Sequence, residues 1–181
     1  MKRIRSFVVT TALCLVCFHA SAQEMQPQAH GLCAVAEEPV FSCTLQGPSS
    51  KTVSLCASPV AVQGERSFRY RYGRPSRIEL TYPESGNGSD AFTSTHTVFS
   101  DGTGGGTYAF TNKGYKYILY LVSGTGFEYG GLQVRKEGLS RFTSDRRCQK
   151  STLLQTTNKE LWNATRKWKE DPSLTFFRSN H

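Results

Sequence analysis

Alternating aromatic and aliphatic residues, broken at glycines, fill residues 107–134 and constrain the fold more than any other stretch. Tyr108 and Phe110 share one face of the first run. Four residues of the second run share a face at the strand period of two: Tyr115, Tyr117, Leu119 and Leu121. Between the runs, Asn112-Lys113-Gly114 predicts a three-residue hairpin turn, because Gly114 can take a positive φ. A third run, residues 127–134, follows Ser123-Gly124-Thr125-Gly126, so the stretch predicts an antiparallel meander with an exposed glycine-rich loop.

Shorter alternating runs precede the meander. Residues 40–45 and 52–57 predict a hairpin in which Phe41, Cys43 and Leu45 share a face with Val53, Leu55 and Ala57. Residues 67–73 predict a strand with Phe68, Tyr70 and Tyr72 facing inward and Arg69 and Arg71 facing outward. Residues 77–82 predict the strand that follows.

Two further strands are predicted at residues 91–99 and 139–148, with a polar loop at 84–90 and a flexible glycine-rich connection at 101–106. Turn signals recur about every ten residues, as in all-β proteins. We therefore expect an all-β fold, an antiparallel barrel or sandwich of about eight strands with a C-terminal helix.

The tail has a different pattern. Residues 151–170 lack glycine and proline, and four residues recur at helical spacing: Leu154, Leu161, Thr165 and Trp168. This predicts an amphipathic helix that caps the barrel and ends at Asp171-Pro172; a helix on a membrane surface is the alternative, although its apolar face is thin. The expected organisation is a lead-in at 23–38, a β domain at 39–148 and a helical tail at 149–181.

The first 22 residues have the pattern of a signal peptide. Lys2, Arg3 and Arg5 precede an apolar run at 7–18, and Ala20-Ser21-Ala22 offers a cleavage site. The run is shorter than the ~20 residues of a spanning helix, so we expect a periplasmic or secreted mature chain without a transmembrane segment. Cleavage would remove three positive charges and lower the formal charge from +8 to +5. That charge favours anionic partners or simply keeps the protein soluble, and nucleic acid is not an expected partner.

Four cysteines would remain after cleavage: Cys33, Cys43, Cys56 and Cys148. An even number in an oxidising compartment predicts two disulfides, with three connectivities open. In the predicted hairpin register Cys43 and Cys56 point to opposite faces, which disfavours a bond between them. We favour Cys33 with Cys43, and Cys56 with Cys148. The absence of a C-x-x-C pair counts against redox catalysis and zinc binding, and we expect no metal or cofactor.

Several runs within residues 33–148 resemble a family of small exported proteobacterial proteins without an established activity: VFSC, KTVSLCAS, YRYG, IELTYP and GLQVRKEG. A second resemblance is local. Residues 123–129, followed by Gly138, are similar to the S-G-x-x-x-x-Y loop of the membrane-bound and periplasmic C-type lysozyme inhibitors. In those small exported β-barrels the loop enters the lysozyme active cleft. The resemblance implies a partner-binding site at five residues: Ser123, Gly124, Thr125, Gly126 and Tyr129.

The chain offers few residues for catalysis. His96 could pair with Asp90 or Asp101, but a single strand histidine is more often a packing or surface residue, and neither a G-x-S-x-G nor an H-E-x-x-H motif occurs. Glu79 is expected to face solvent or to pair with Arg69 or Arg71. Residues 102–106 resemble a phosphate-binding loop only superficially, because no helix follows. We therefore expect no catalytic residues and no enzyme.

Arginines are concentrated within a dozen residues: Arg66, Arg69, Arg71, Arg74 and Arg77. Guanidinium groups suit carboxylates and phosphates, so the face of Arg69 and Arg71 could bind an anionic envelope component; a solvated outer face explains the same pattern. The function expected first is a periplasmic, non-enzymatic binding protein, an inhibitor or immunity protein against a peptidoglycan hydrolase. The alternative is an envelope structural or anionic-ligand-binding protein that uses the arginine face. Basic animal lysozymes are disfavoured partners because like charges oppose encounter.

Overall fold

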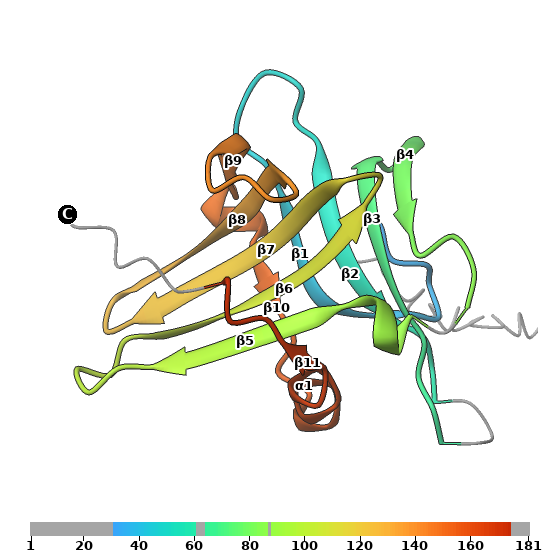
Figure 1. The fold of residues 1–181 in the computed structure, drawn as a ribbon. Helices are drawn as coiled ribbons and strands as arrows, with labels where there is room; N and C mark the ends of the chain where they lie inside the picture. Colours follow the sequence, from blue (N-terminus) through green and yellow to red (C-terminus); the bar gives the residue numbers. More distant parts are fainter. Residues whose placement is uncertain (1–30, 61–63, 87, 175–181) are drawn as a thin grey trace, which may run out of the picture.

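The computed structural model describes residues 31–60, 64–86 and 88–174, which form two β-sheets packed as a sandwich (Figure 1). One sheet has the strand order β10-β1-β2-β3-β4 and the other β11-β5-β6-β7-β8-β9. The prediction of an all-β fold with a C-terminal helix is confirmed, and the sheets form a sandwich rather than a closed barrel. The predicted signal peptide lies outside the described residues. Within the described ranges, no helix is long and apolar enough to cross a membrane.

The first sheet contains the predicted hairpin in its predicted register, with Phe41 opposite Leu55 and Cys43 opposite Val53. Its strands are β1 (Glu38–Thr44), β2 (Thr52–Ala57), β3 (Phe68–Arg74), β4 (Arg77–Tyr82) and β10 (Leu154–Gln155). Every residue of β2 is buried. The second sheet covers one face of β2, and the segment around Leu32, whose N–H donates to Ser54 Oγ at 2.9 Å, covers the other.

The second sheet is built around the predicted meander. Its strands are β5 (Thr93–Val98), β6 (Gly104–Asn112), β7 (Tyr115–Gly124), β8 (Phe127–Lys136), β9 (Phe142–Arg147) and β11 (Lys169–Glu170). Two short 3-10 turns, η1 (Ser89–Ala91) and η2 (Lys150–Thr152), lie between strands. The prediction of a flexible connection at 101–106 is wrong for its second half, because Gly104, Gly105 and Gly106 pair with β5. Gly106 lies against the His96 ring, where a Cβ would be 3.0 Å from Nδ1.

The turn between β6 and β7 is one residue shorter than predicted. Asn112 pairs with Tyr115, so only Lys113 and Gly114 form the turn. Both have positive φ, 49° and 75°, which is the signature of the type I′ turn that suits the twist of a hairpin. Lysine therefore occupies a left-handed position where Asn or Gly is usual.

Two disulfides lie within the described residues, but the pairing favoured from the sequence is wrong. Cys33 is bonded to Cys56, and Cys43 to Cys148. Cys43 and Cys56 do point to opposite faces of the hairpin. Cys56 points away from the second sheet and meets Cys33, while Cys43 points between the sheets and meets Cys148 at the end of β9. The path of the segment around Cys33 across the outer face, which the strand pattern does not reveal, decides the partners.

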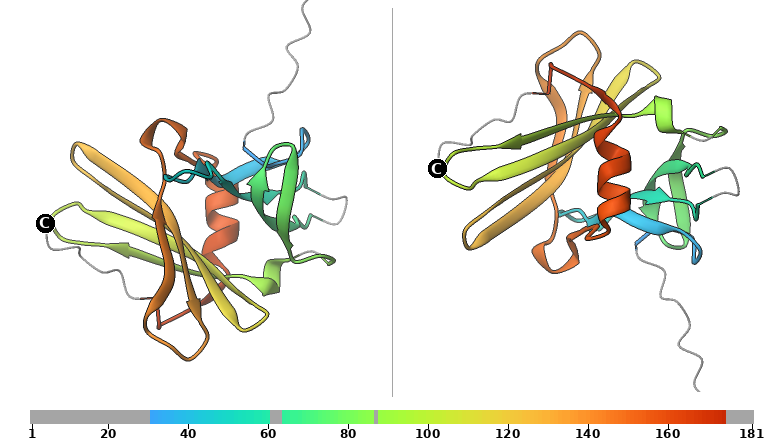
Figure 2. Two further views of the ribbon diagram at one scale, coloured as in Figure 1. Left: turned by 90° about the horizontal axis from the view of Figure 1, so that it is seen from above. Right: turned by 90° about the horizontal axis from the view of Figure 1, so that it is seen from below.

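The C-terminal helix is shorter than predicted: α1 (Lys159–Arg166) lies between the two sheets at one side of the sandwich (Figure 2). Asn158 caps it, its side chain accepting from the Glu160 N–H at 2.9 Å. Leu161 and Thr165 are fully buried, as their spacing predicted. Leu154 instead belongs to β10, and residues 169–170 add a parallel strand to β5. The tail thus contributes a strand to each sheet.

Candidate functional site

A cavity of about 500 Å³ lies between the sheets. Apolar and aromatic side chains from both sheets form most of its lining: Leu45, Tyr70, Tyr72, Leu80, Tyr115, Tyr117, Leu132 and Val134. Polar and charged residues complete it: Glu79, Asn112, Lys113, Thr143, Ser144 and Arg146. A hollow of this size, largely apolar with a few polar groups, has the character of a small-molecule site.

Two tyrosines of the lining, Tyr70 and Tyr117, contact a ring of the core, Phe110, that does not itself line the cavity. Phe110 stacks on Tyr117 at 4.9 Å between ring centroids and on Tyr82 at 4.3 Å, and it contacts Tyr70 at 4.8 Å. The strand period places these residues here, because Tyr70, Phe110 and Tyr117 all face inward on their strands. Aromatic rings have few rotatable bonds, so this part of the lining is held in a defined shape.

Tyr70 is an unusual member of the lining. Its side chain is completely buried, and its hydroxyl has no hydrogen-bond partner among the described residues. Burial, and then the neighbouring Tyr117 and Tyr72, raise the pKa of Tyr70 well above its usual value, so the group remains a protonated donor. An unpaired buried hydroxyl costs about 1–3 kcal/mol.

The charged residues of the lining carry a positive excess. Lys113 is exposed, and Arg146 donates from Nη1 to the Gln46 carbonyl at 3.3 Å. Among the described residues, Glu79 is the only acidic residue of the lining, and its carboxylate is paired with Lys51. The hydrogen bond from Lys51, its charge and the charges of Arg77 and Arg74 hold the pKa of Glu79 below its usual value. The sequence predicted that Glu79 faces solvent or pairs with Arg69 or Arg71; Glu79 is exposed, and its ion pair is with Lys51.

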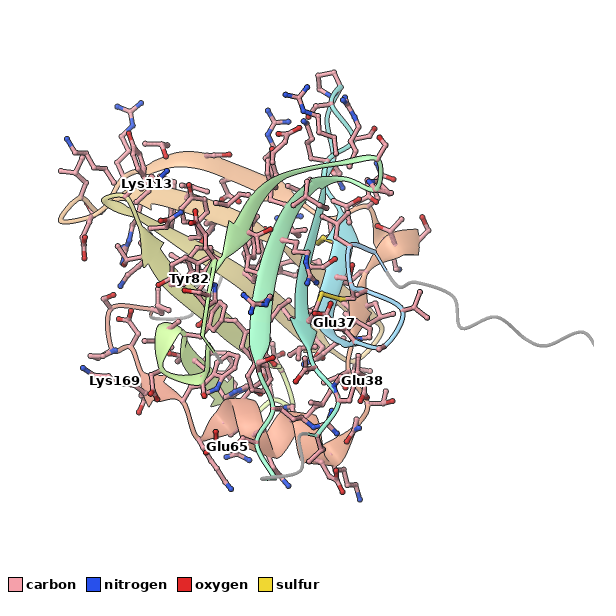
Figure 3. The ribbon with its side chains drawn as sticks, turned by 90° about the vertical axis from the view of Figure 1, so that its right-hand side faces the viewer. Glu37, Glu38, Glu65, Tyr82, Lys113 and Lys169 are labelled. Atoms are coloured by element: carbon pink, nitrogen blue, oxygen red, sulfur yellow. A yellow bond between two sulfur atoms is a disulfide. The ribbon has the colours of Figure 1, made fainter. Side chains whose placement is uncertain are left out.

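Lys113 lies in the β6–β7 turn and is labelled in Figure 3. Its φ of 49° is one of two positive values found at non-glycine residues in the described ranges; the other is at Ser50. A residue with a Cβ in this region costs roughly 1–2 kcal/mol relative to the right-handed region. Strain of this kind is retained most often where a side chain has a task.

The predicted inhibitor loop is a tight turn. Ser123 and Gly124 belong to β7, and Gly124 pairs with Phe127 across a two-residue turn of Thr125 and Gly126. The Phe127 ring covers Gly124, where a Cβ would lie 2.6 Å from two ring atoms. Gly124 therefore has a packing role.

Tyr129 lies on the outer face of β8, beneath the Arg147 guanidinium at 5.0 Å and beside the Phe127 ring at 6.2 Å. The structure brings the five predicted loop residues together on one hairpin. Arg69 and Arg71 lie in the other sheet, on β3.

Two neighbouring hairpins carry exposed apolar side chains at their tips. The β5–β6 and β7–β8 hairpins extend together on the left of Figure 1, and Gly104 pairs with Ser123 between them. Val98 is 85% exposed and Phe127 is 43% exposed. These tips, defined here by Val98 and Phe127, form a surface that alternation alone did not identify.

The arginines predicted to bind anions are engaged within the protein. Arg69 donates to the Pro83 and Gly86 carbonyls, at 2.7 and 3.3 Å. Arg71 pairs with Glu37 through both of its terminal nitrogens. Glu37, labelled in Figure 3, also lies near the sulfurs of Cys33 and Cys56, but their disulfide offers no thiolate to a metal.

His96 is packed among aromatic rings. Its ring lies 5.8 Å from Trp162 and 6.1 Å from Tyr108. Burial and the nearby Arg166 charge lower the pKa of His96, so it is neutral at pH 7. Its Nε2 has no hydrogen-bond partner within the part of the chain that the structure describes.

A larger hollow of about 790 Å³ lies beside α1, above the buried Trp168. Its lining contains three acidic and three basic residues: Glu65, Asp90, Glu160, Arg66, Lys167 and Lys169. Arg66 lies 3.7 Å from Glu38 and 3.9 Å from Glu160. These charges balance, so this hollow is less suited to select a ligand than the aromatic cavity.

Comparisons with known proteins do not add an assignment. No protein-family model, curated protein or solved structure matches the chain.

Proposed function

We propose that this protein is an exported, non-enzymatic binding protein that takes a small apolar ligand between its two sheets. The observation that carries the proposal is the aromatic cavity, which is lined by tyrosine rings from both sheets. The two disulfides fit an oxidising compartment. Together with the signal-peptide pattern of residues 1–22, they support a periplasmic or secreted location.

Burial of apolar surface supplies the affinity in this proposal. A ligand that loses roughly 200 Å² of apolar surface gains about 5 kcal/mol at the usual coefficient of about 25 cal/mol per Å², before the costs of association. Tyr117 of the lining is held by its stack on Phe110, so it needs little ordering when the ligand enters, which reduces those costs.

The test uses N-phenyl-1-naphthylamine, an uncharged probe that fluoresces in apolar surroundings. We expect saturable fluorescence with the wild-type protein and a loss of at least tenfold in affinity in Val134→Trp, which fills the cavity. Val35→Trp is the matched control, since Val35 is 61% exposed and does not line the cavity. Equal affinity of both variants and the wild type would exclude the cavity as the site.

A second candidate function rests on the exposed tips. A protein partner would cover Val98 and Phe127, as an inhibitor or immunity protein covers a peptidoglycan hydrolase. Tip residues held on paired strands lose little conformational entropy on binding. Glu128 is exposed beside Phe127 and would be repelled by the paired carboxylates of a glycosidase cleft. The apolar surface beside such a cleft is therefore the better docking position.

Inhibition assays against a panel of muramidases and peptidoglycan amidases test this second candidate. We expect Val98→Ser with Phe127→Ser to weaken any inhibition at least tenfold, whereas Val35→Ser leaves it unchanged. Ser123→Ala and Tyr129→Ala show whether the predicted loop residues contribute to inhibition independently of the tips. Absence of inhibition across the panel would remove the hydrolase partner.

A further inference from the structure

We infer that the ligand of the cavity is a single-chain anionic amphiphile, with its carboxylate attracted by the charges of Lys113 and Arg146 and its chain among the tyrosines. This inference rests on the proposed function, since it assigns the ligand class of the same cavity. In this inference the anion is recognised by Lys113 and Arg146, whereas the sequence had suggested Arg69 and Arg71. Lys113 and Arg146 lie on the second sheet and line the cavity.

Arg146 is directed toward the space between the sheets by its place in β9. It pairs with Leu132, and paired residues of neighbouring strands share a face, so both lie on the side of the buried core. A guanidinium has five N–H donors. One nitrogen of Arg146, Nη1, donates to Gln46; the other two have no hydrogen-bond partner among the described residues. Arg146 is thus held in position and still has donors for a carboxylate.

Lys113 supplies the second cation. It makes no ion pair with any residue in the described ranges. Glu79 does not compensate it, because the Glu79 carboxylate is paired with Lys51. The polar part of the cavity lining therefore keeps an unbalanced positive charge beside apolar side chains. This arrangement complements a ligand with an anionic head on an apolar chain.

The backbone at Lys113 gives a way to separate charge from structure. Its left-handed conformation suits asparagine better than lysine. Lys113→Asn therefore removes the cation while favouring the native turn, so weaker binding in this variant cannot come from damage to the fold. Lys159→Gln is the control, because Lys159 is an exposed residue at the start of α1 and does not line the cavity.

The experiment measures displacement of N-phenyl-1-naphthylamine by three ten-carbon ligands: decanoate, 1-decanol and decylammonium. We expect decanoate to displace the probe at least tenfold more effectively than decylammonium in the wild-type protein. Lys113→Asn and Arg146→Gln should each reduce that preference about threefold or more, and Lys159→Gln should preserve it.

The outcomes separate the two proposals. If the probe binds but decanoate and decylammonium displace it equally, the anionic head is excluded and the apolar site stands. The same conclusion follows if Lys113→Asn and Arg146→Gln both keep the full preference for decanoate. If the probe binds equally well to Val134→Trp, the apolar site itself is excluded.

Discussion

Arg71 and Glu37 form a bidentate ion pair on the outer side of the first sheet, with Arg71 Nη2 2.9 Å from Glu37 Oε1 and Nη1 bonded to Oε2. Both side chains are mostly buried, at 16% and 15% exposed. Arg71 Nη1 also reaches the Leu32 carbonyl at 3.4 Å. The pair therefore fastens the segment around the Cys33–Cys56 disulfide to β3, and Arg71 is occupied by a structural task.

Arg71→Gln should destabilise the protein. Loss of hydrogen bonds to a charged group costs about 2 kcal/mol, and we expect a fall of that size in the free energy of unfolding at pH 7, measured by urea denaturation. Arg77→Gln is the control, because Arg77 is exposed. Equal stability of both variants would contradict the structural role of Arg71.

The same pair predicts a dependence on pH. Burial alone would raise the pKa of Glu37, but the hydrogen bonds from Arg71 and the Ala34 N–H and the Arg71 charge bring it below its usual value of 4.5. A lowered pKa contributes stability above pH 4.5 that is lost as the pH falls through the folded value. We expect Arg71→Gln to reduce this acid-dependent loss, and an unchanged slope of stability below pH 4.5 would contradict it.

The two disulfides should differ in their contribution to stability. The Cys43–Cys148 bond closes a loop of sequence separation 105, and Cys33–Cys56 one of 23. In the chain-entropy model the longer loop contributes more, by about 1 kcal/mol. Urea denaturation of the two paired Cys→Ser variants measures the difference. A non-reduced peptide that links Cys33 to Cys43 would contradict the connectivity.

Tyr70→Phe should stabilise the ligand-free protein. It removes a buried hydroxyl without a partner and keeps the ring contact with Phe110, so the free energy of unfolding should rise by about 1 kcal/mol. Tyr82→Phe, in the same stack but partly buried, serves as the control. Destabilisation by Tyr70→Phe would mean that the hydroxyl is satisfied in solution.

Lys113→Asn should also stabilise the protein. Asparagine tolerates the left-handed conformation that Lys113 adopts at φ 49°, so we expect a gain of roughly 0.5–1 kcal/mol. Thermal unfolding of the variant measures it. Lys136→Asn, at the end of β8, controls for the charge. A melting temperature below that of wild type would contradict the turn assignment.

Much of the fold could be predicted because strand alternation is a local property. It located the β1–β2 and β6–β7 hairpins, and it predicted that Tyr70 and Phe110 face the interior. Disulfide partners could not be predicted in this way, because Cys33 reaches Cys56 through the path of a segment that has no periodic pattern. The length of the helix was overestimated, because helical spacing of apolar residues reveals neither the Asn158 cap nor the pairing of β10 with β1.

The candidate site was less predictable. The run that forms β9, FTSDRR, has no apolar alternation, so nothing in the sequence indicated that Arg146 faces the cavity. Lys113 was assigned to a three-residue turn in which Gly114 was the residue expected to take a positive φ. The cavity itself could not be predicted, because it exists only where residues from the two sheets meet.

Methyl-resolved NMR of the full mature chain tests the central claim most directly, that an apolar ligand binds between the sheets. Titration with N-phenyl-1-naphthylamine should shift the methyl signals of Leu80, Leu132 and Val134, which line the cavity. The signals of Val35, on the surface, and Leu161, a buried residue of α1, should stay in place. Shifts centred on Leu161, or no shift at the three cavity residues at saturating probe, would contradict the account.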